Sequence, residues 1–257
     1  MSVSNAYEDA SGQADGSKLD GGLASLAWIA LWLVIGISMA IQLAIPVNHD
    51  AAWVLIGAQR MLEGASFGAD VVDVNPPLAW WMSALPAALA QATGLPTGAV
   101  FKLVVMAASL VSLLASARLM TAADIAPARS RWITLATAAA LLVVPGYDFG
   151  QREHLMAILI MPWLWLTAAT FNGAKLATGL RVAVAVAAAL GICLKPHFLV
   201  VPVAVELLVL VVMRRPLLAM RLENLVMIAT GVAYVAAVVV FAPGYLCLLY
   251  TSDAADE

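Results

Sequence analysis

The chain has 257 residues, of which 63% are hydrophobic and only 11% are charged, and its formal net charge is −3. Soluble globular domains are about half apolar and about a quarter charged, so the composition excludes a soluble protein. It also excludes a basic nucleic-acid-binding surface. The two cysteines, Cys193 and Cys247, make neither a disulfide framework nor a zinc-ligand pattern. We therefore expect an integral membrane protein that contacts the lipid bilayer and binds no nucleic acid.

The first segment, residues 1–21, is rich in Ser, Gly and Asp and is expected to be a disordered cytoplasmic tail. Leu23 to Ile45 is then almost entirely apolar and exceeds the roughly 20 residues that a helix needs to cross a bilayer core. This segment is too long for a signal peptide, it lacks a basic flank, and no cleavage site follows it. We therefore expect a first spanning helix.

Further apolar runs follow along the chain, and with the first they predict about seven spanning helices. Lipid offers no hydrogen-bond partner to exposed backbone groups, so each run is expected to be helical. The predicted fold is thus an all-α, polytopic transmembrane helical bundle over residues 22–245, with interfacial helices in its first outer loop. The runs lie at about 100–121, 132–146, 155–172, 177–194, 198–213 and 223–242.

The first polar segment, residues 48–77, begins with His49 and Asp50 where the first helix leaves the membrane. Residues 50–63 are expected to form a helix on the membrane surface. The sequence leaves two interpretations of Asp50 open. It caps this helix, or it is a carboxylate held at the surface to take a proton from an acceptor hydroxyl. Asp73, near the end of the segment, is either an ordinary loop residue or part of the same site.

The second polar segment, Tyr147 to His154, places Asp148, Arg152, Glu153 and His154 between two apolar runs. Charged groups this close to a bilayer are costly unless they are paired or functional. An Asp148–Arg152 pair at i, i+4 is expected if the turn is helical, but it leaves Glu153 and His154 unexplained. An arginine can also hold a phosphate with its bidentate fork, so we favour a functional interpretation of this segment.

The third polar segment, Lys195-Pro196-His197, lies at a helix break, because proline ends or kinks a helix. Lys195 either reaches the interface as a solvated charge or binds a ligand. Glu206 is the only charged residue in the apolar run 203–213. It is expected to face the bundle interior, either paired or protonated.

The basic residues predict the topology, because cytoplasmic loops carry the excess of Lys and Arg. If the N-terminus is cytoplasmic and residues 77–95 lie in the outer interface without crossing, nine of these residues are inside and four are outside. If residues 77–95 cross, the count is reversed. An outer N-terminus with a crossing segment also gives nine inside and remains an alternative. The preferred arrangement is a multi-pass protein of the plasma (bacterial inner) membrane, with all three polar segments on its outer face.

In order and position, these segments resemble the GT-C superfamily of integral-membrane glycosyltransferases, such as protein O-mannosyltransferases and aminoarabinose transferases. The likeness covers residues 22 to about 200. It rests on the first spanning helix with His49-Asp50, the amphipathic stretch Ala51–Gly64, Asp70–Leu78 with its Pro-Pro-Leu and the aromatic Trp80 or Trp81, and Pro145 followed by Asp148–His154. Many members have a basic residue before Pro-Pro-Leu, whereas this chain has Asn75.

The resemblance implies a transferase that moves a sugar from a polyprenyl-phosphate carrier to an acceptor hydroxyl of a glycan, lipid or protein on the outer face. Asp50 falls on the family's acidic residue after the first helix and would be the general base. The acidic residue of the second outer loop falls on Asp148 or Glu153, and the choice stays open. The substrate-binding residues expected from the polar segments are His49, Asp73, Arg152, His154, Lys195 and His197. Acidic residues beside a phosphate could share a divalent cation, although the spacing does not require one.

The main alternative is a secondary transporter in which Arg152, Lys195 and Glu206 line a substrate path. Such transporters usually carry internal repeats and polar sites at the membrane midplane. The sequence has no convincing repeat, and its polar groups cluster at one face, which favours the transferase.

The final residues, 246–257, resemble translated sequencing-adapter sequence. We therefore expect a non-native tail there and a native protein that continues beyond about residue 245.

Overall fold

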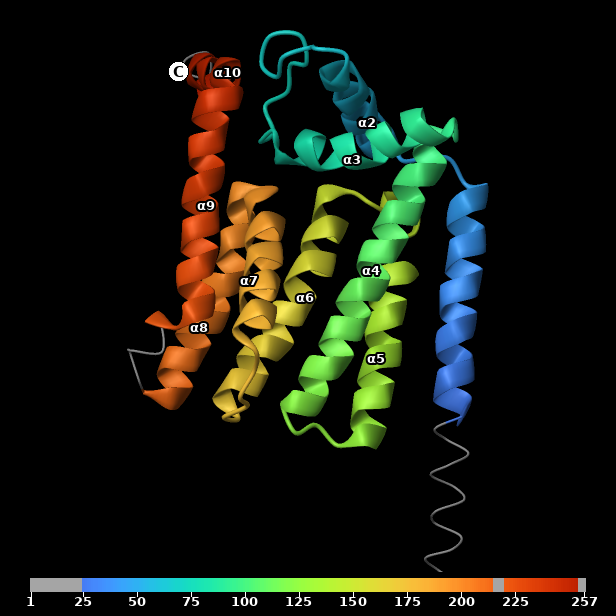
Figure 1. Cartoon of the computed structure of the whole chain (residues 1–257), viewed down its shortest axis with the longest axis vertical. Helices are drawn as coiled ribbons and strands as arrows, with labels where there is room; N and C mark the ends of the chain where they lie inside the picture. The colour runs from blue at the N-terminus through green and yellow to red at the C-terminus, as the bar shows by residue number, and fades with distance from the viewer. Residues whose placement is uncertain (1–24, 215–219, 254–257) are drawn as a thin grey trace, which may run out of the picture.

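The computed structural model of the chain (Figure 1) describes residues 25–214 and 220–253, so the expected disordered tail, 1–21, lies outside the described residues. Of the described residues, 80% are helical and none forms a strand. The only ladder-type pairing among them is an isolated bridge between Phe67 and Val71. The predicted all-α class is therefore confirmed.

Four helices are long and apolar enough to cross a bilayer: the N-terminal helix Ser25–Ala44, α4 (Thr97–Ala122), α6 (Arg152–Phe171) and α9 (Leu222–Phe241). Three shorter helices accompany them in the bundle, α5 (Pro127–Leu142), α7 (Thr178–Cys193) and α8 (Val200–Met213). Their 14 to 16 residues span about 21–24 Å at the rise of an α-helix. Four described helices are thus long and apolar enough to span a membrane, while the expected total of seven spans remains a prediction.

Two helices, α2 (His49–Leu62) and α3 (Leu78–Thr93), lie across one end of the bundle instead of running along it (Figure 1). This is the arrangement expected of residues 77–95 if they do not cross. The two helices pack closely because Gly57 has no side chain, and a Cβ added there would lie 2.6 Å from the fully buried Trp80 ring. On the outer side of α2, Trp53, Ile56 and Leu62 are exposed, as expected for a helix on a membrane surface.

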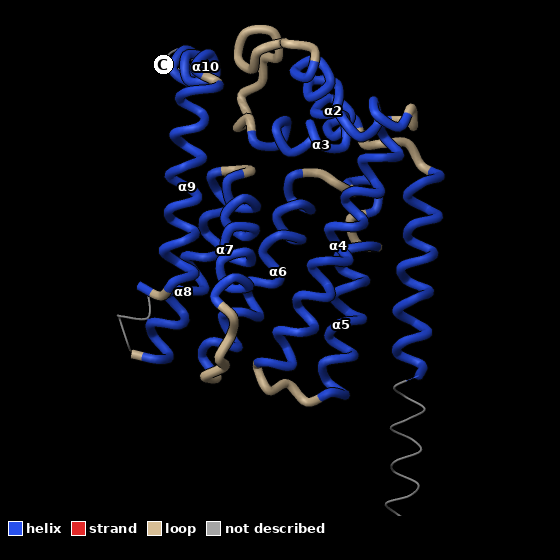
Figure 2. Tube along the Cα trace, viewed as in Figure 1, coloured by secondary structure: helices blue, strands red, loops and turns tan. Residues whose placement is uncertain are grey.

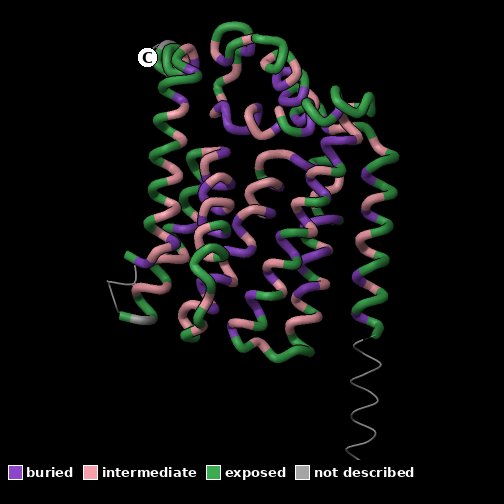
Figure 3. Tube along the Cα trace, in the orientation of Figure 1, coloured by how far each residue is buried: buried purple, intermediate pink, exposed green. Residues whose placement is uncertain are grey.

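The main hydrophobic core lies beneath α3, where it joins α6, α7 and α9 around the fully buried Trp80 and Trp163. A second core, around Phe101 and Phe149, joins α2, α4, α5 and α6. Figure 3 shows α9 mostly exposed or intermediate, and only 6% of its apolar window is buried. This face of the bundle is apolar and uncovered by other described helices.

The long loop between α2 and α3 lies at the same end of the molecule as α10 (Pro243–Asp253) in Figure 2. The two segments meet where Gly68, with φ of +93°, lies against the backbone of Gly244 and Tyr245. A Cβ on Gly68 would lie 2.3 Å from the Tyr245 amide nitrogen. Tyr245 is buried, so this contact fixes the loop over the bundle.

A chain of alternating charges joins α7, α8 and α9 at the opposite end of the bundle. Arg181 donates two hydrogen bonds to Glu223, of 2.8 and 3.0 Å, and Glu223 is 1% exposed. Arg221 binds both carboxylate oxygens of Glu206 and also donates to the Thr167 hydroxyl at 3.2 Å. Glu206 is therefore paired, and its partner is an arginine 15 residues further along the chain.

Candidate functional site

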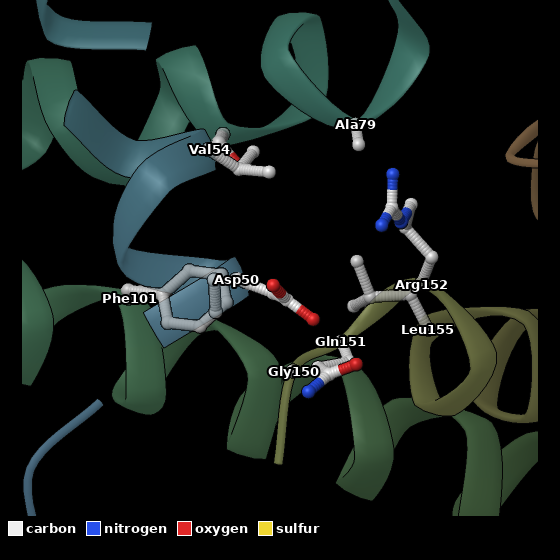
Figure 4. Close-up of a pocket in the computed structure, with 10 residues that line it drawn as sticks. Asp50, Val54, Ala79, Phe101, Gly150, Gln151, Arg152 and Leu155 are labelled. Carbon is white, nitrogen blue, oxygen red and sulfur yellow. The ribbon is translucent and has the colours of Figure 1, made fainter. Parts of the chain in front are cut away.

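A narrow cleft lies where α2 and α3 cover the ends of α4 and α6. Its lining includes Asp50 and Val54 from α2, Ala79 from α3, and Gln151 and Arg152 from the start of α6. Figure 4 shows the side chains of Asp50 and Arg152 entering it from different helices. The cavity volume is about 20 Å³, which is room for about one water-sized group. Only a single hydroxyl or phosphate oxygen would enter the cleft, while the rest of a substrate would lie outside its mouth.

Asp50 lies in the first turn of α2 but is not its cap. The cap is Asn48, whose side-chain oxygen accepts a 2.9 Å hydrogen bond from the Asp50 amide nitrogen. The interpretation of Asp50 as a capping residue is therefore wrong. Its carboxylate is 51% exposed and lies 3.3 Å from Nε2 of His49, which is itself 81% exposed. The Asp50 carboxylate therefore borders the cleft and does not cap α2.

Arg152 is the first residue of α6, and its guanidinium enters the cleft from the side opposite α2 (Figure 4). Its Nη1 atom is buried and has no hydrogen-bond partner among the described residues. No carboxylate of the described residues lies within ion-pair distance of it either. A buried cationic donor without a partner is costly, and an anionic ligand in the cleft would satisfy it.

Asp148 joins the first and second polar segments. Its Oδ1 accepts hydrogen bonds of 3.0 Å from the side chains of Asn48 and Gln151. The predicted Asp148–Arg152 pair is therefore wrong, because residues 146–148 form a 3₁₀ turn that ends before α6 begins. Asp148 instead binds Asn48, 100 residues away in sequence, and so fixes the turn that precedes Asp50.

The His154 side chain connects two backbone segments, at Gly150 and at Leu141. Its Nδ1 accepts a hydrogen bond of 2.9 Å from the Gly150 amide, and its Nε2 lies 2.7 Å from the Leu141 carbonyl. The ring is therefore neutral with its proton on Nε2, and neither nitrogen is left for a substrate. This differs from the expected role of His154 in substrate binding, because the residue is buried and shapes the loop. Gly150 has φ of +85°, and a Cβ on it would lie 2.5 Å from the Phe101 ring.

Glu153 and Lys195 form an ion pair that joins the second and third polar segments. Glu153 is half exposed, Lys195 is mostly covered, and neither lines the cleft. His197 is exposed and packs edge-on against Phe198. All three polar segments thus meet at one end of the bundle, but Asp50 and Arg152 are the ionisable residues that border the cleft itself.

Asp73 orders the loop before α3. One of its oxygens accepts hydrogen bonds from the backbone and side chain of Asn75, at 2.8 and 2.7 Å. The other accepts from the Trp53 indole at 3.1 Å. Both carboxylate oxygens of Asp73 thus accept hydrogen bonds within the protein. The residue connects the loop to α2, which differs from its expected role in substrate binding.

Polar side chains that the sequence did not single out hold the first helix to the end of α5, to Gly146 just before the second polar segment, and to α4. Ser38 donates to the Leu142 carbonyl, and Gln42 donates to the Gly146 carbonyl at 2.8 Å. Lys102, which is 5% exposed on α4, donates to the carbonyls of Gln42, Ile45 and Pro46 at 2.5, 2.6 and 3.3 Å. A charged residue inside an apolar run, far from the polar end of the helix where Arg118 lies, is the signal that would have identified Lys102.

The described residues contain no group of three or more His, Cys, Asp or Glu that could hold a metal ion. Asp50 is the one carboxylate in the lining of the cleft. A divalent cation there would therefore take most of its oxygen ligands from a bound phosphate and from water.

No protein-family model, curated protein or solved structure matches this chain.

Proposed function

We propose that the protein is a membrane glycosyltransferase that moves a sugar from a polyprenyl-phosphate carrier to an acceptor hydroxyl. One observation carries the proposal: the half-exposed Asp50 carboxylate and the Arg152 guanidinium, whose buried Nη1 has no hydrogen-bond partner among the described residues, border the same cleft at one end of the helical bundle. This combination suits a reaction that removes a proton and releases a phosphate anion. The ordered resemblance to GT-C enzymes supports the same chemistry.

In the proposed reaction, the acceptor oxygen forms a bond to the anomeric carbon of the sugar. Asp50 takes the proton of the acceptor hydroxyl as a general base. The bond from the anomeric carbon to the phosphate oxygen breaks, and the polyprenyl phosphate leaves with the bonding electrons. Arg152 stabilises that charge with hydrogen bonds that strengthen as it develops. The cleft has room for one oxygen, so a phosphate oxygen enters it toward the buried Nη1 of Arg152, while the acceptor hydroxyl lies at its mouth beside the half-exposed Asp50 and the sugar and prenyl chain remain outside.

The other expected site residues have supporting roles in this proposal. Asp148 fixes the turn of Asp50 through Asn48. Glu153 and Lys195 neutralise one another, which leaves Arg152 as the charge available to the carrier phosphate. His49 lies at the mouth of the cleft beside Asp50, where it would contact the acceptor.

The transporter alternative has less support, because its three charged residues do not share one path. Glu206 lines a different, apolar groove between α7, α8 and α9 and is bound by Arg221. Lys195 is bound to Glu153. Only Arg152 borders the cleft.

The proposal requires the cleft to face the outer side of the plasma membrane, with the N-terminus in the cytoplasm. In a variant with Cys193 and Cys247 replaced by serine, Ser66→Cys should react with a membrane-impermeant maleimide in intact cells. Arg129→Cys, at the opposite end of the bundle, should react only after the cells are opened. Both positions are exposed in the folded protein. A difference in labelling therefore reports the side of the membrane on which each residue lies. The reverse pattern would contradict the outer site.

Arg152→Gln tests the phosphate contact directly. A hydrogen bond to a charged group contributes about 1.5–3 kcal/mol, so we expect affinity for a polyprenyl monophosphate to fall roughly 10–100-fold. Binding would be measured on the reconstituted protein, with thermal unfolding to verify the fold. Arg60→Gln is the matched control, because Arg60 is exposed on α2 at the same end. Equal losses in both variants would mean that only general charge attraction is involved and would overturn the proposed role of Arg152.

A further inference from the structure

A second polar cavity lies at the end of the bundle away from the cleft, between the start of the N-terminal helix, the end of α4 and the start of α5. Its volume is about 300 Å³, and it opens to the surface. The N-terminal helix contributes an apolar wall with Trp28 and Leu31. The facing wall includes Thr121, Ser130 and Arg131. The cavity therefore pairs an apolar side with a basic, hydroxyl-bearing side.

The polar wall retains unused hydrogen-bond donors. Arg131 is half-buried and forms no ion pair with any described residue. Among the described residues, the Ser130 hydroxyl has only the Met120 sulfur as a partner, at 4.0 Å, and a thioether sulfur is a weak acceptor. By contrast, the Thr121 hydroxyl donates to the Ala117 carbonyl at 3.2 Å. Arg131 and Ser130 are therefore the groups that can donate to a ligand.

The surroundings of the cavity are basic and carry exposed tryptophans. The stretch 118–131 holds Arg118, Arg129 and Arg131 against a single acidic residue, Asp124. Trp28 and Trp132 are 54% and 50% exposed beside it, and such tryptophans are typical of the membrane–water interface. Basic pockets between membrane helices at this depth bind anionic headgroups.

We propose that this cavity binds the phosphodiester headgroup of an anionic phospholipid. Arg131 and Ser130 donate to the phosphate oxygens, and an acyl chain follows the apolar wall along Leu31. The charge of the wall selects an anionic headgroup over a zwitterionic one, because an ammonium group would be repelled by the Arg131 guanidinium that lines the cavity. The site is independent of the proposed transferase cleft, which lies at the other end of the bundle (Figure 1).

The test is native mass spectrometry of the purified full chain after exchange into phosphatidylglycerol or phosphatidylcholine. We expect the wild-type protein to retain phosphatidylglycerol preferentially. Arg131→Gln should reduce that preference roughly fivefold, the effect of about one basic residue near an anionic headgroup. The matched control is Arg129→Gln, which makes the same charge change two residues away on an exposed side chain outside the cavity lining.

A second variant tests whether the shape of the cavity, and not only its charge, determines lipid binding. Ala117→Leu adds volume to the cavity lining without altering any charge, and it should also reduce retention of phosphatidylglycerol. Thermal unfolding of each variant verifies that the bundle remains folded. The proposal is overturned if the wild-type protein shows no preference for phosphatidylglycerol, or if Arg129→Gln and Arg131→Gln reduce the preference equally.

Discussion

Asp50→Asn is expected to lower the rate of sugar transfer about 10²–10⁴-fold, the usual contribution of a positioned general base. The fold should be nearly unaffected, because Asn48 and not Asp50 caps α2. The substitution removes one acidic side chain from the first turn of a helix, where a charge at the dipole contributes about 0.3–1 kcal/mol. The pair with His49 is exposed, and exposed pairs contribute little. Asp50→Asn is thus expected to lower activity strongly and to leave stability nearly unchanged.

The measurement is the initial rate of transfer from a polyprenyl-phosphate-linked sugar in membranes that contain equal amounts of each variant. Glu63→Gln is the matched control, because Glu63 ends the same helix and is exposed, and its rate should equal that of the wild type. Normal turnover in Asp50→Asn would exclude Asp50 as the base.

Local features of the sequence predicted the elements around the site well. The polar break after the first helix, the prolines before α3 and the tandem tryptophans were enough to indicate helices that lie across the end of the bundle. These signals act within a few residues, as capping and proline effects do. The expected meeting of the polar segments also agrees with the structure, through the Asn48–Asp148 hydrogen bond and the Glu153–Lys195 ion pair.

Partners that are distant in sequence could not be predicted, because nothing in a single sequence couples them. Asp148 had a plausible local partner in Arg152, yet it binds Asn48, 100 residues away. His154 looked available for a ligand, yet both ring nitrogens bind backbone groups. Glu206 was expected to be paired or protonated, and only the packing of α8 against the start of α9 identified Arg221. A polar residue near a membrane needs a partner, but its identity depends on tertiary structure.

Lys102→Met is expected to lower stability and activity together, in contrast to Asp50→Asn. The buried ammonium group holds the carbonyls of Gln42, Ile45 and Pro46, where the first helix ends. Methionine has a similar length but donates no hydrogen bond, so carbonyls at this helix end lose their partner in a water-poor environment. A buried unsatisfied polar group costs about 1–3 kcal/mol, and this is the loss of stability that we expect.

The effect on activity follows from the position of the Lys102 contacts. They immediately precede the turn at Asn48, which caps α2 and binds Asp148. If this turn loosens, Asp50 and Arg152 no longer border the same narrow cleft, and a displacement of about 1 Å can cost about 10²-fold in rate. Lys175→Met makes the same change at an exposed residue and should leave both properties unchanged. Thermal unfolding and transfer rates of the two variants test this, and a Lys102→Met protein with wild-type stability would show that the ammonium is not what fixes the end of the first helix.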